Sequence, residues 1–326
     1  MRLSLLDRSR TRADRPDAEG VTATVERAVR AERLGYHRFW VAEHHGVPGI
    51  ASGTPAVLLA AVGAATSTIR LGSGGVMLPH HQPFVVAEQF RVLEALNPGR
   101  VDLGLGRSSG FTPPVRAVLR EQEHSPEEAA ARFADDVREL RAHLDGSGPV
   151  TVRPSGGPVP LFLLATGRGI ALAAELGLPV VVGGPILDSP DLPSVLDAYR
   201  RTFRPSPGAE APSVTISLDV LVADDAATAR ELALPEAWAM ATSRRTGEFP
   251  PLESPDAIRA HRWPEQVRRR VEESLDRAYA GPPDAVRPRL EALVERTGAD
   301  ELLASTSTWD REALHAADAA LRGLVA

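Results

Sequence analysis

Short apolar runs rich in β-branched residues alternate along the chain with stretches of helical period. This alternation is typical of repeated βα units around a parallel sheet. The runs that predict strands span residues 2–7, 37–43, 69–78, 101–107, 159–166, 179–184, 214–223 and 301–308. Helices are expected between them, among others over residues 20–35, 54–66, 83–96, 125–144 and 284–298.

Local signals mark where some of these helices begin and end. Ser125, with Glu128 three residues later, has the capping-box pattern of a helix N-terminus. Gly298 follows a helical stretch and suits a C-cap. The stretch 235–282 is rich in Trp, Pro and Arg and lies between the seventh and eighth strands, so we expect a helical insertion there. The links rich in Gly and Pro are short, which predicts a single domain over residues 1–326.

Eight strands that alternate with helices can close into a (β/α)₈ TIM barrel or form an open, doubly wound sheet. No G-x-G-x-x-G motif follows the first strand, and a P-loop cannot exist in a chain without lysine. The commonest reasons for an open nucleotide-binding sheet are therefore missing. We expect an α/β protein with a TIM barrel, a fold that suits a chain of 326 residues with insertions.

Charge and composition exclude several classes of protein. All 37 basic residues are arginine and the net charge is -6, whereas a nucleic-acid surface needs a basic excess. Cysteine is absent, which excludes disulfides, thiolate nucleophiles and cysteine metal sites. No apolar run has the length of a membrane span, and the first residues do not resemble a signal peptide. We expect a cytoplasmic protein with neither nucleic acid nor a membrane as partner.

In a TIM barrel the active site lies where the strands end and their loops begin. The predicted strand ends carry Glu43, His44 and His45, then Met77 to His81, Arg107 to Gly110, Thr166 to Gly169, and Ser305 to Trp309. Strand alternation places the side chains of Glu43 and His44 on opposite faces.

Four histidines, at positions 44, 45, 80 and 81, fall at two neighbouring strand ends and would allow a metal site. Glu43 is the one carboxylate with suitable spacing to join them. We therefore predict no metal ion, and histidines 45, 80 and 81 can also be read as surface-loop residues.

Two features favour a flat, phosphorylated ligand. Three glycines fall within the strand at 69–78, where glycine weakens a sheet unless a ligand approaches closely or the strand has a β-bulge. Arg107 offers a fork suited to phosphate, although a lone arginine is more often in a surface ion pair. The loop Thr166–Gly169 runs into a helix, whose N-terminus favours anions.

The chain resembles the bacterial luciferase-like flavin-dependent monooxygenases in segments that occur in the family's order and at matching separations. They read GYHRFWVAEHH (35–45), IRLGSGGVMLPHHQPFVVAEQFRVLEALNPGRVDLGLGR (69–107), AAELGLP (173–179) and GADELLASTSTWD (298–310). The resemblance covers nearly the whole chain except residues 110–150 and about 186–280.

This resemblance implies a TIM barrel that binds reduced, diffusible FMN supplied by a separate NAD(P)H-dependent flavin reductase. Oxygen would form a flavin C4a-hydroperoxide, which oxygenates a small organic substrate. The family's active-site histidine maps onto His44, beside Glu43, with a role in acid/base catalysis. A non-prolyl cis peptide near the flavin maps onto Gly74-Gly75, and Ser73, Gly74 and Gly75 are all expected to contact the flavin.

The FMN-phosphate arginine of the family maps onto Arg107, and a second phosphate contact maps onto Thr166, Gly167, Arg168 and Gly169. Many relatives have Gly-Ser-Ser where this chain has Ala165-Thr166-Gly167, and Arg168 adds a charge there. Close relatives also have an Ala-Pro-Gly-like run where this chain has Ser108-Ser109-Gly110.

Two other functions are compatible with the same fold. One is hydride transfer with a deazaflavin coenzyme, which needs no oxygen, and the other is a non-catalytic flavin-binding subunit. Analogy with the family also implies a homodimer.

Overall fold

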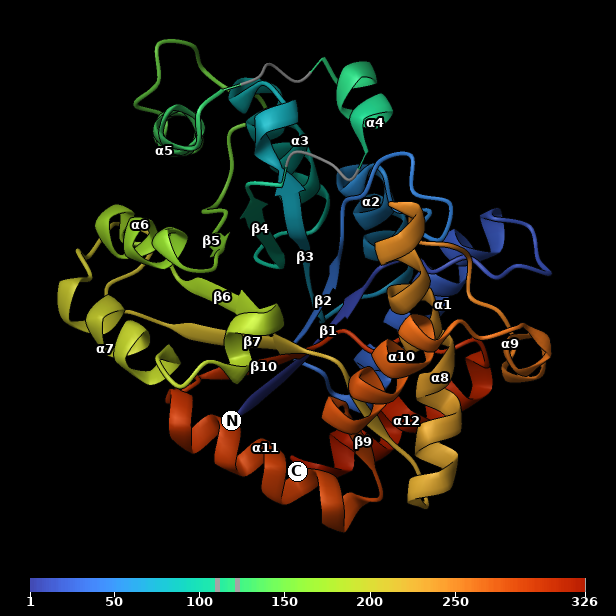
Figure 1. The fold of residues 1–326 in the computed structure, drawn as a ribbon. Coiled ribbons are helices and arrows are strands. Elements are labelled where there is room, and N and C mark those ends of the chain that lie inside the picture. Colours follow the sequence, from blue (N-terminus) through green and yellow to red (C-terminus); the bar gives the residue numbers. More distant parts are fainter. Residues whose placement is uncertain (109–111, 121–123, 326) are drawn as a thin grey trace.

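The computed structural model describes residues 1–108, 112–120 and 124–325. Within this part of the chain, eight parallel strands close into a barrel (Figure 1). In order around the barrel they are β1 (Arg2–Asp7), β10 (Glu301–Ala304), β7 (Val214–Leu218), β6 (Val180–Gly183), β5 (Leu161–Leu164), β4 (Val101–Gly106), β3 (Arg70–Met77) and β2 (Arg38–Val41). β2 pairs with β1 and closes the circle, so the predicted TIM barrel is confirmed.

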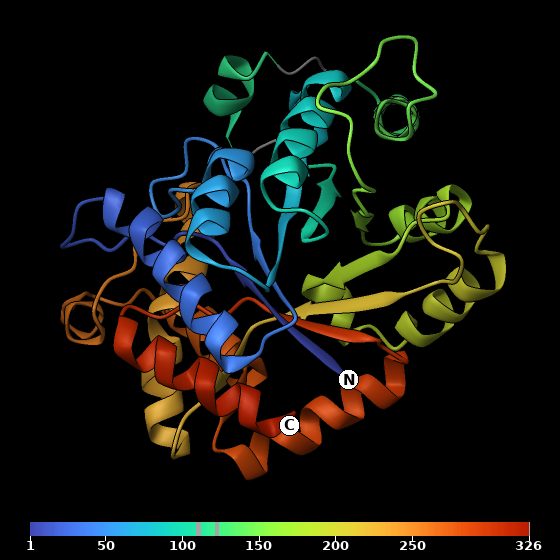
Figure 2. The same ribbon diagram turned by 180° about the vertical axis from the view of Figure 1, so that it is seen from behind.

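Helices surround the barrel, and both chain ends lie on one side of it (Figures 1 and 2). They are α1 (Ala18–Leu34), α2 (Pro55–Ala65), α3 (Pro83–Leu96), α4 (Pro113–Val118), α5 (Pro126–Asp145), α6 (Arg168–Leu176), α7 (Leu192–Thr202), α8 (Ala226–Thr246), α9 (Pro255–Ala260), α10 (Glu265–Arg277), α11 (Pro283–Thr297) and α12 (Arg311–Leu324), with 3₁₀ turns η1 (Leu78–His80) and η2 (Gly184–Asp188). Among the described residues, no helix combines the length and the apolar character that a membrane crossing requires.

The ends of these elements follow the chemistry of the sequence. The capping box at the start of α5 is confirmed, since Ser125 Oγ accepts from the Glu128 amide and the Glu128 side chain accepts from the Ser125 amide. α11 ends at Gly298, which adopts the left-handed conformation that glycine tolerates best. β6 reads VVVG and is buried through its first three residues, as expected for a parallel strand covered on both faces.

The region between the seventh and eighth barrel strands differs from the sequence prediction. The expected strand 214–223 breaks at Asp219 into β7, in the barrel, and β8 (Val220–Val222), which pairs with β9 (Tyr279–Gly281) in a separate sheet. The expected insertion, 235–282, begins in the middle of α8 and contains a strand as well as helices. α8 and α10 pack around a small core of their own, and in Figures 1 and 2 they lie on the side of the barrel opposite α6 and α7.

The barrel interior contains charged groups at its N-terminal end and apolar groups above them. Arg38 donates to Asp102 at 2.5 Å and to Glu301 at 3.1 Å, and all three residues are buried. Above this network the indole of Trp40 packs edge-on against Phe162, with ring centroids 5.1 Å apart. A buried ion network needs every partner, because a charge left alone in the interior is strongly destabilising.

Trp40 explains one of the glycines in β3. A Cβ atom at Gly72 would lie 2.2 Å from Trp40 Nε1, so no side chain is possible at this position. On the next strand, a Cβ atom at Gly104 would lie 2.2 Å from the carbonyl oxygen of Ser73. The glycines at 72 and 104 therefore serve close packing inside the barrel rather than contact with a ligand.

Gly104 and Gly106 on β4 provide a matched test of this packing. We expect Gly104→Ala to lower the free energy of unfolding by about 1–3 kcal/mol, because backbone must move to admit the methyl group. Gly106→Ala should change it far less, because the nearest atom to a Cβ there is 3.8 Å away. Urea denaturation of the two variants measures the difference, and equal losses would contradict the packing argument.

Candidate active site

A cavity of about 580 Å³ opens at the C-terminal ends of the barrel strands. This volume lies within the usual range for small-molecule and cofactor sites. Its wall includes the predicted residues Glu43, His44, Gly74, Gly75 and Arg107. Thr166 and Gly169 also line it, so residues from four predicted strand ends meet in one place.

His44 lies just beyond β2, and its backbone amide donates to the carbonyl of Ser52 at 2.9 Å. Burial lowers the pKa of His44 to about 4, and the nearby charges of Arg8 and Arg10 act in the same direction. The imidazole is therefore neutral at physiological pH and available to accept a proton. Side chains of this kind perform acid/base chemistry in many enzymes.

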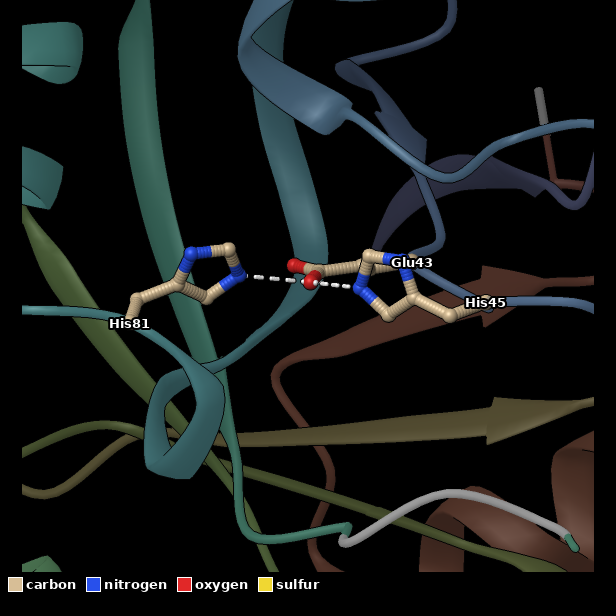
Figure 3. A group of neighbouring side chains, drawn as sticks. All are labelled: Glu43, His45 and His81. Carbon is tan, nitrogen blue, oxygen red and sulfur yellow. Dashed lines mark hydrogen bonds and ion pairs between the residues drawn. The ribbon is translucent and has the colours of Figure 1, made fainter. Parts of the chain in front are cut away.

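The carboxylate of Glu43 forms a cluster with His45 and His81 (Figure 3). Its Oε1 accepts from Nε2 of His45 and from Nε2 of His81, each at 2.6 Å, and its Oε2 accepts from the Met77 amide at 3.0 Å. Burial would raise the pKa of Glu43, but the hydrogen bonds from His45 and His81, the charge of His81 and the Met77 amide lower it to about 2. Glu43 thus holds the ends of β2 and β3 together, as an anion.

Glu43, His45 and His81 form the group that could hold a metal ion within the described residues. Two imidazoles and a carboxylate are ligands that transition metals accept. In this structure, however, one carboxylate oxygen lies between the two ring nitrogens, at hydrogen-bond distances from both (Figure 3). The group is therefore a hydrogen-bonded clamp between two strand ends.

The glycines at 74 and 75 form a wall of the cavity without side chains. The peptide bond between them is cis, as the family resemblance implies, and the pairing of β3 with β4 shifts register between Ser73 and Val76. The β-bulge interpretation of the glycine run is thus confirmed, and the strand is irregular where it borders the cavity. The Ser73 hydroxyl instead donates to the Gly104 carbonyl at 2.8 Å, within the sheet.

The opposite end of the cavity lies at the start of α6. Thr166 and Gly169 line it together with Arg107, which is exposed. Gly167 is the residue before the helix, with a φ of 52°. The side chain of Arg168 is 91% exposed and lies 3.6 Å from Glu127, outside this cavity. Of the predicted phosphate loop, the structure therefore brings Thr166 and Gly169 to the cavity, but not the Arg168 side chain.

Three charged residues near the cavity were missed by the sequence analysis. Arg8 follows β1 and lines the wall, Asp219 follows β7, and Glu236 comes from α8. The rule that strand ends form the site would have found Arg8 and Asp219 if it had been applied to every strand. Nothing in the sequence indicates that Glu236 reaches the barrel. The predicted Ser109 and Gly110 lie outside the described residues.

The cavity has the features that FMN requires. The wall at Gly74 and Gly75 has no side chains, which leaves space for a flat ring system. At the far end Arg107, the Thr166 hydroxyl and the N-terminus of α6 are groups that hold phosphate. The residues present are therefore of the kinds that would hold a phosphorylated flavin.

Comparison with known proteins agrees with this geometry. The family described as luciferase-like monooxygenase matches residues 1–301. A luciferase-like monooxygenase of Escherichia coli (strain K12) is 35% identical over 328 residues, which cover 98% of this chain and 95% of that protein. The N-acetyl-S-alkylcysteine monooxygenase of Bacillus subtilis (strain 168) is 39% identical over 222 residues, 65% of each chain. The chain therefore belongs to the luciferase-like monooxygenase family.

Solved structures show the same fold. The crystal structure of apo-MsnO8 has a TM-score of 0.88 and 32% identity, over 99% of this chain and 98% of that one. Two more distant structures differ in their cofactor. One is the oxygenating constituent of 3,6-diketocamphane monooxygenase from Pseudomonas putida in complex with FMN, with a TM-score of 0.74, 18% identity and coverage of 100% and 98%. The other is an F420-dependent secondary alcohol dehydrogenase, with a TM-score of 0.73, 16% identity and coverage of 99% and 97%.

The clamp around Glu43 predicts a pH-dependent contribution to stability. Because the pKa of Glu43 is about 2 instead of 4.5, the anion stabilises the fold above pH 4.5, and this contribution is lost as the pH falls through about 2. Glu43→Gln should lower the free energy of unfolding at pH 7 by about 2–3 kcal/mol, with a smaller difference from wild type below pH 4.5. Denaturant titrations from pH 7 to pH 3 measure this.

Glu231→Gln provides the control, because Glu231 is partly exposed and paired with Arg259 at the surface. Its effect should stay below about 1 kcal/mol at all these pH values. A Glu43→Gln effect that does not change with pH would refute the assignment of Glu43 as a stabilising anion.

Proposed function

We propose that the protein is a flavin-dependent monooxygenase that uses reduced FMN and O₂ to oxygenate a small organic substrate. A separate NAD(P)H-dependent flavin reductase supplies the reduced FMN, and the reaction takes place in the cytoplasm. The observation that carries the proposal is a single cavity in which a wall of two glycines, an end suited to phosphate and a neutral, half-buried histidine meet. Membership of the luciferase-like monooxygenase family supports it.

FMN would supply the activation of oxygen, and the residues of the chain would do the rest. Arg107, Thr166 and Gly169 hold the phosphate, and Gly74 and Gly75 leave room for the ring. The apolar side chains of Leu6, Ala42 and Val181 in the wall would limit the water around the reacting atoms. His44, neutral at physiological pH, accepts a proton from the substrate side of the ring and returns it later.

A deazaflavin-dependent hydride transfer is the second candidate, and one observation favours it. A groove of about 360 Å³ continues from Arg107 and Gly169 past the side chains of Arg138 and Arg168. A cofactor with a longer tail than FMN would find room there, beside arginines of which Arg138 is paired with Asp135 and Glu175 of the same groove. A non-catalytic flavin-binding subunit is the third candidate.

Anaerobic titration with reduced FMN, followed by admission of oxygen, tests the proposal. We expect saturable binding and then a transient flavin spectrum that differs from both reduced and oxidised FMN and outlives the reoxidation of free FMN. Absence of binding, together with oxygen-independent reduction of a carbonyl by a reduced deazaflavin, would establish the second candidate instead. Binding of reduced FMN that is reoxidised as fast as free FMN, with no transient spectrum, would establish the third.

His44→Ala should lower turnover at least tenfold without loss of FMN binding, because it removes the proton acceptor at the ring. His315→Ala is the control, since His315 lies on α12 outside the cavity and is also largely buried. Oxygen-consumption rates and FMN titrations on both variants provide the comparison. Turnover of His44→Ala equal to that of the control would remove His44 from the mechanism.

The surface of α2 and α3 supports the further proposal that the protein is a homodimer. The two helices pack side by side, and Val57, Val92 and Leu96 are 70%, 47% and 65% exposed on them. An exposed apolar patch of this kind is typical of a protein interface. In a dimer with two-fold symmetry, the patch of one subunit would pack against the same patch of the other subunit, and both would be buried.

Leu96→Glu should therefore convert the dimer to a monomer, because it places a charge in the interface. Val118→Glu is the control, since Val118 is 82% exposed on α4 and belongs to neither α2 nor α3. Sedimentation measurements give the mass of each variant. A wild-type protein that sediments as a monomer, or a dimer unaffected by Leu96→Glu, would contradict the proposed interface.

A further inference from the structure

Arg8 occupies the end of the cavity that lies away from the phosphate-binding residues. It directly follows β1, and its Nη2 donates to Asp219 at 2.9 Å and to the carbonyl oxygen of Ser305 at 2.7 Å. Its Nη1 lies 3.4 Å from Glu236 of α8. These contacts fix the guanidinium in the cavity wall, with 17% of the side chain exposed.

The charges around the described cavity wall are unevenly placed. Three charged side chains line it, from Arg8, Glu43 and Arg107. Glu43 has no exposed side-chain surface, and its oxygens accept from three N–H groups. Arg107 belongs to the phosphate end. Arg8 is therefore the charged group that the wall offers to a substrate near His44.

A comparison with Arg10 shows that Arg8 has a role beyond holding α8 against the barrel. Arg10 donates to Glu236 at 3.1 Å and to the Gly49 carbonyl at 2.8 Å, and only 2% of its side chain is exposed. Arg10 thus already ties α8 to the barrel. Arg8 repeats the contact with Glu236 but also faces the cavity, where a structural role alone would not require a cation.

The contacts of Arg8 leave capacity for a ligand. Nη1 carries two hydrogens, and one ion pair uses one of them. The partner of Nη2, Asp219, has a side chain that is 51% exposed, so another carboxylate can compete with it. A guanidinium is suited to a carboxylate, because its N–H groups match the two oxygens in a plane.

We propose that Arg8 determines substrate specificity by binding a carboxylate of the substrate, so that the substrates are small organic acids. The inference rests on the proposed function, because it assigns the substrate end of the same cavity. The carboxylate binds at Arg8 and places the rest of the molecule over the apolar floor formed by Leu6, Ala42 and Val181, next to His44.

Calorimetric titrations with matched probes test this proposal on the purified full-length protein, with oxidised FMN present and absent. The probes are N-acetylglycine, N-acetyl-S-methylcysteine and N-acetyl-S-benzylcysteine, each compared with its carboxamide. We expect at least one carboxylate to bind tenfold or more tightly than its amide, since a hydrogen bond to a charged group has about that effect. Failure of every carboxylate to exceed its amide would overturn the proposal.

Two variants at the site should act in opposite directions. Arg8→Gln should abolish the preference for the carboxylate, whereas Asp219→Asn should strengthen carboxylate binding by about threefold, because it frees Nη2 from a competing anion. Weaker carboxylate binding in Asp219→Asn would overturn the proposal even if Arg8→Gln fails to fold.

Arg12→Gln is the matched control. Arg12 lies in the loop after β1 with 12% of its side chain exposed, and its partners, Glu19 and the Trp309 carbonyl, are outside the cavity. The Arg12→Gln variant should bind every probe as the wild type does. If Arg12→Gln and Arg8→Gln lost the preference for the carboxylate equally, the assignment of Arg8 would be overturned. The calorimetric titrations measure binding and do not require turnover. If the protein prefers the carboxylate but gives no flavin transient after oxygen is admitted, the monooxygenase function is refuted and the role of Arg8 remains intact.

Discussion

The indole of Trp40 fills the middle of the barrel, and the backbone of β3 passes so close to it that residue 72 must be glycine. Below the ring, its Nε1 faces Asp102 at 3.4 Å, and Asp102 in turn binds Arg38. The ring therefore rests on a charged network and supports the cavity floor above. The ring packs in one cluster with Leu6, Ala42 and Val181, which line the cavity, so the cavity wall depends on the position of this one side chain.

Much of the fold could be predicted from the sequence, because barrel strands such as β5 and β6 are buried on both faces and appear as continuous apolar runs. The break at Asp219 could not, because the apolar pattern continues unchanged from β7 into β8. β9 was also missed. It has three residues, and its pairing with β8 depends on a contact between segments almost sixty residues apart.

The candidate site was predictable where residues follow a strand directly. His44, Arg107 and Thr166 come to one cavity for this reason. The partners of Glu43 could not be predicted from the sequence. Four histidines lie close to it in the chain, and the path of η1 and its flanking turns determines which of them reach the carboxylate. The Ser73 side chain was predicted at the flavin but serves the sheet, since the shift of register at this point turns it toward β4.

Glu236 is shared by two arginines of the barrel, although it belongs to a helix that comes more than two hundred residues later in the chain. An exchange of the segment between β7 and β10 with that of a relative would therefore have to bring an acid to the same point. Without it, the chimaera would bury two positive charges with one partner fewer. Recombination between such proteins is thus limited by the ion pairs of Glu236 with Arg8 and Arg10, in addition to the shapes of the packed surfaces.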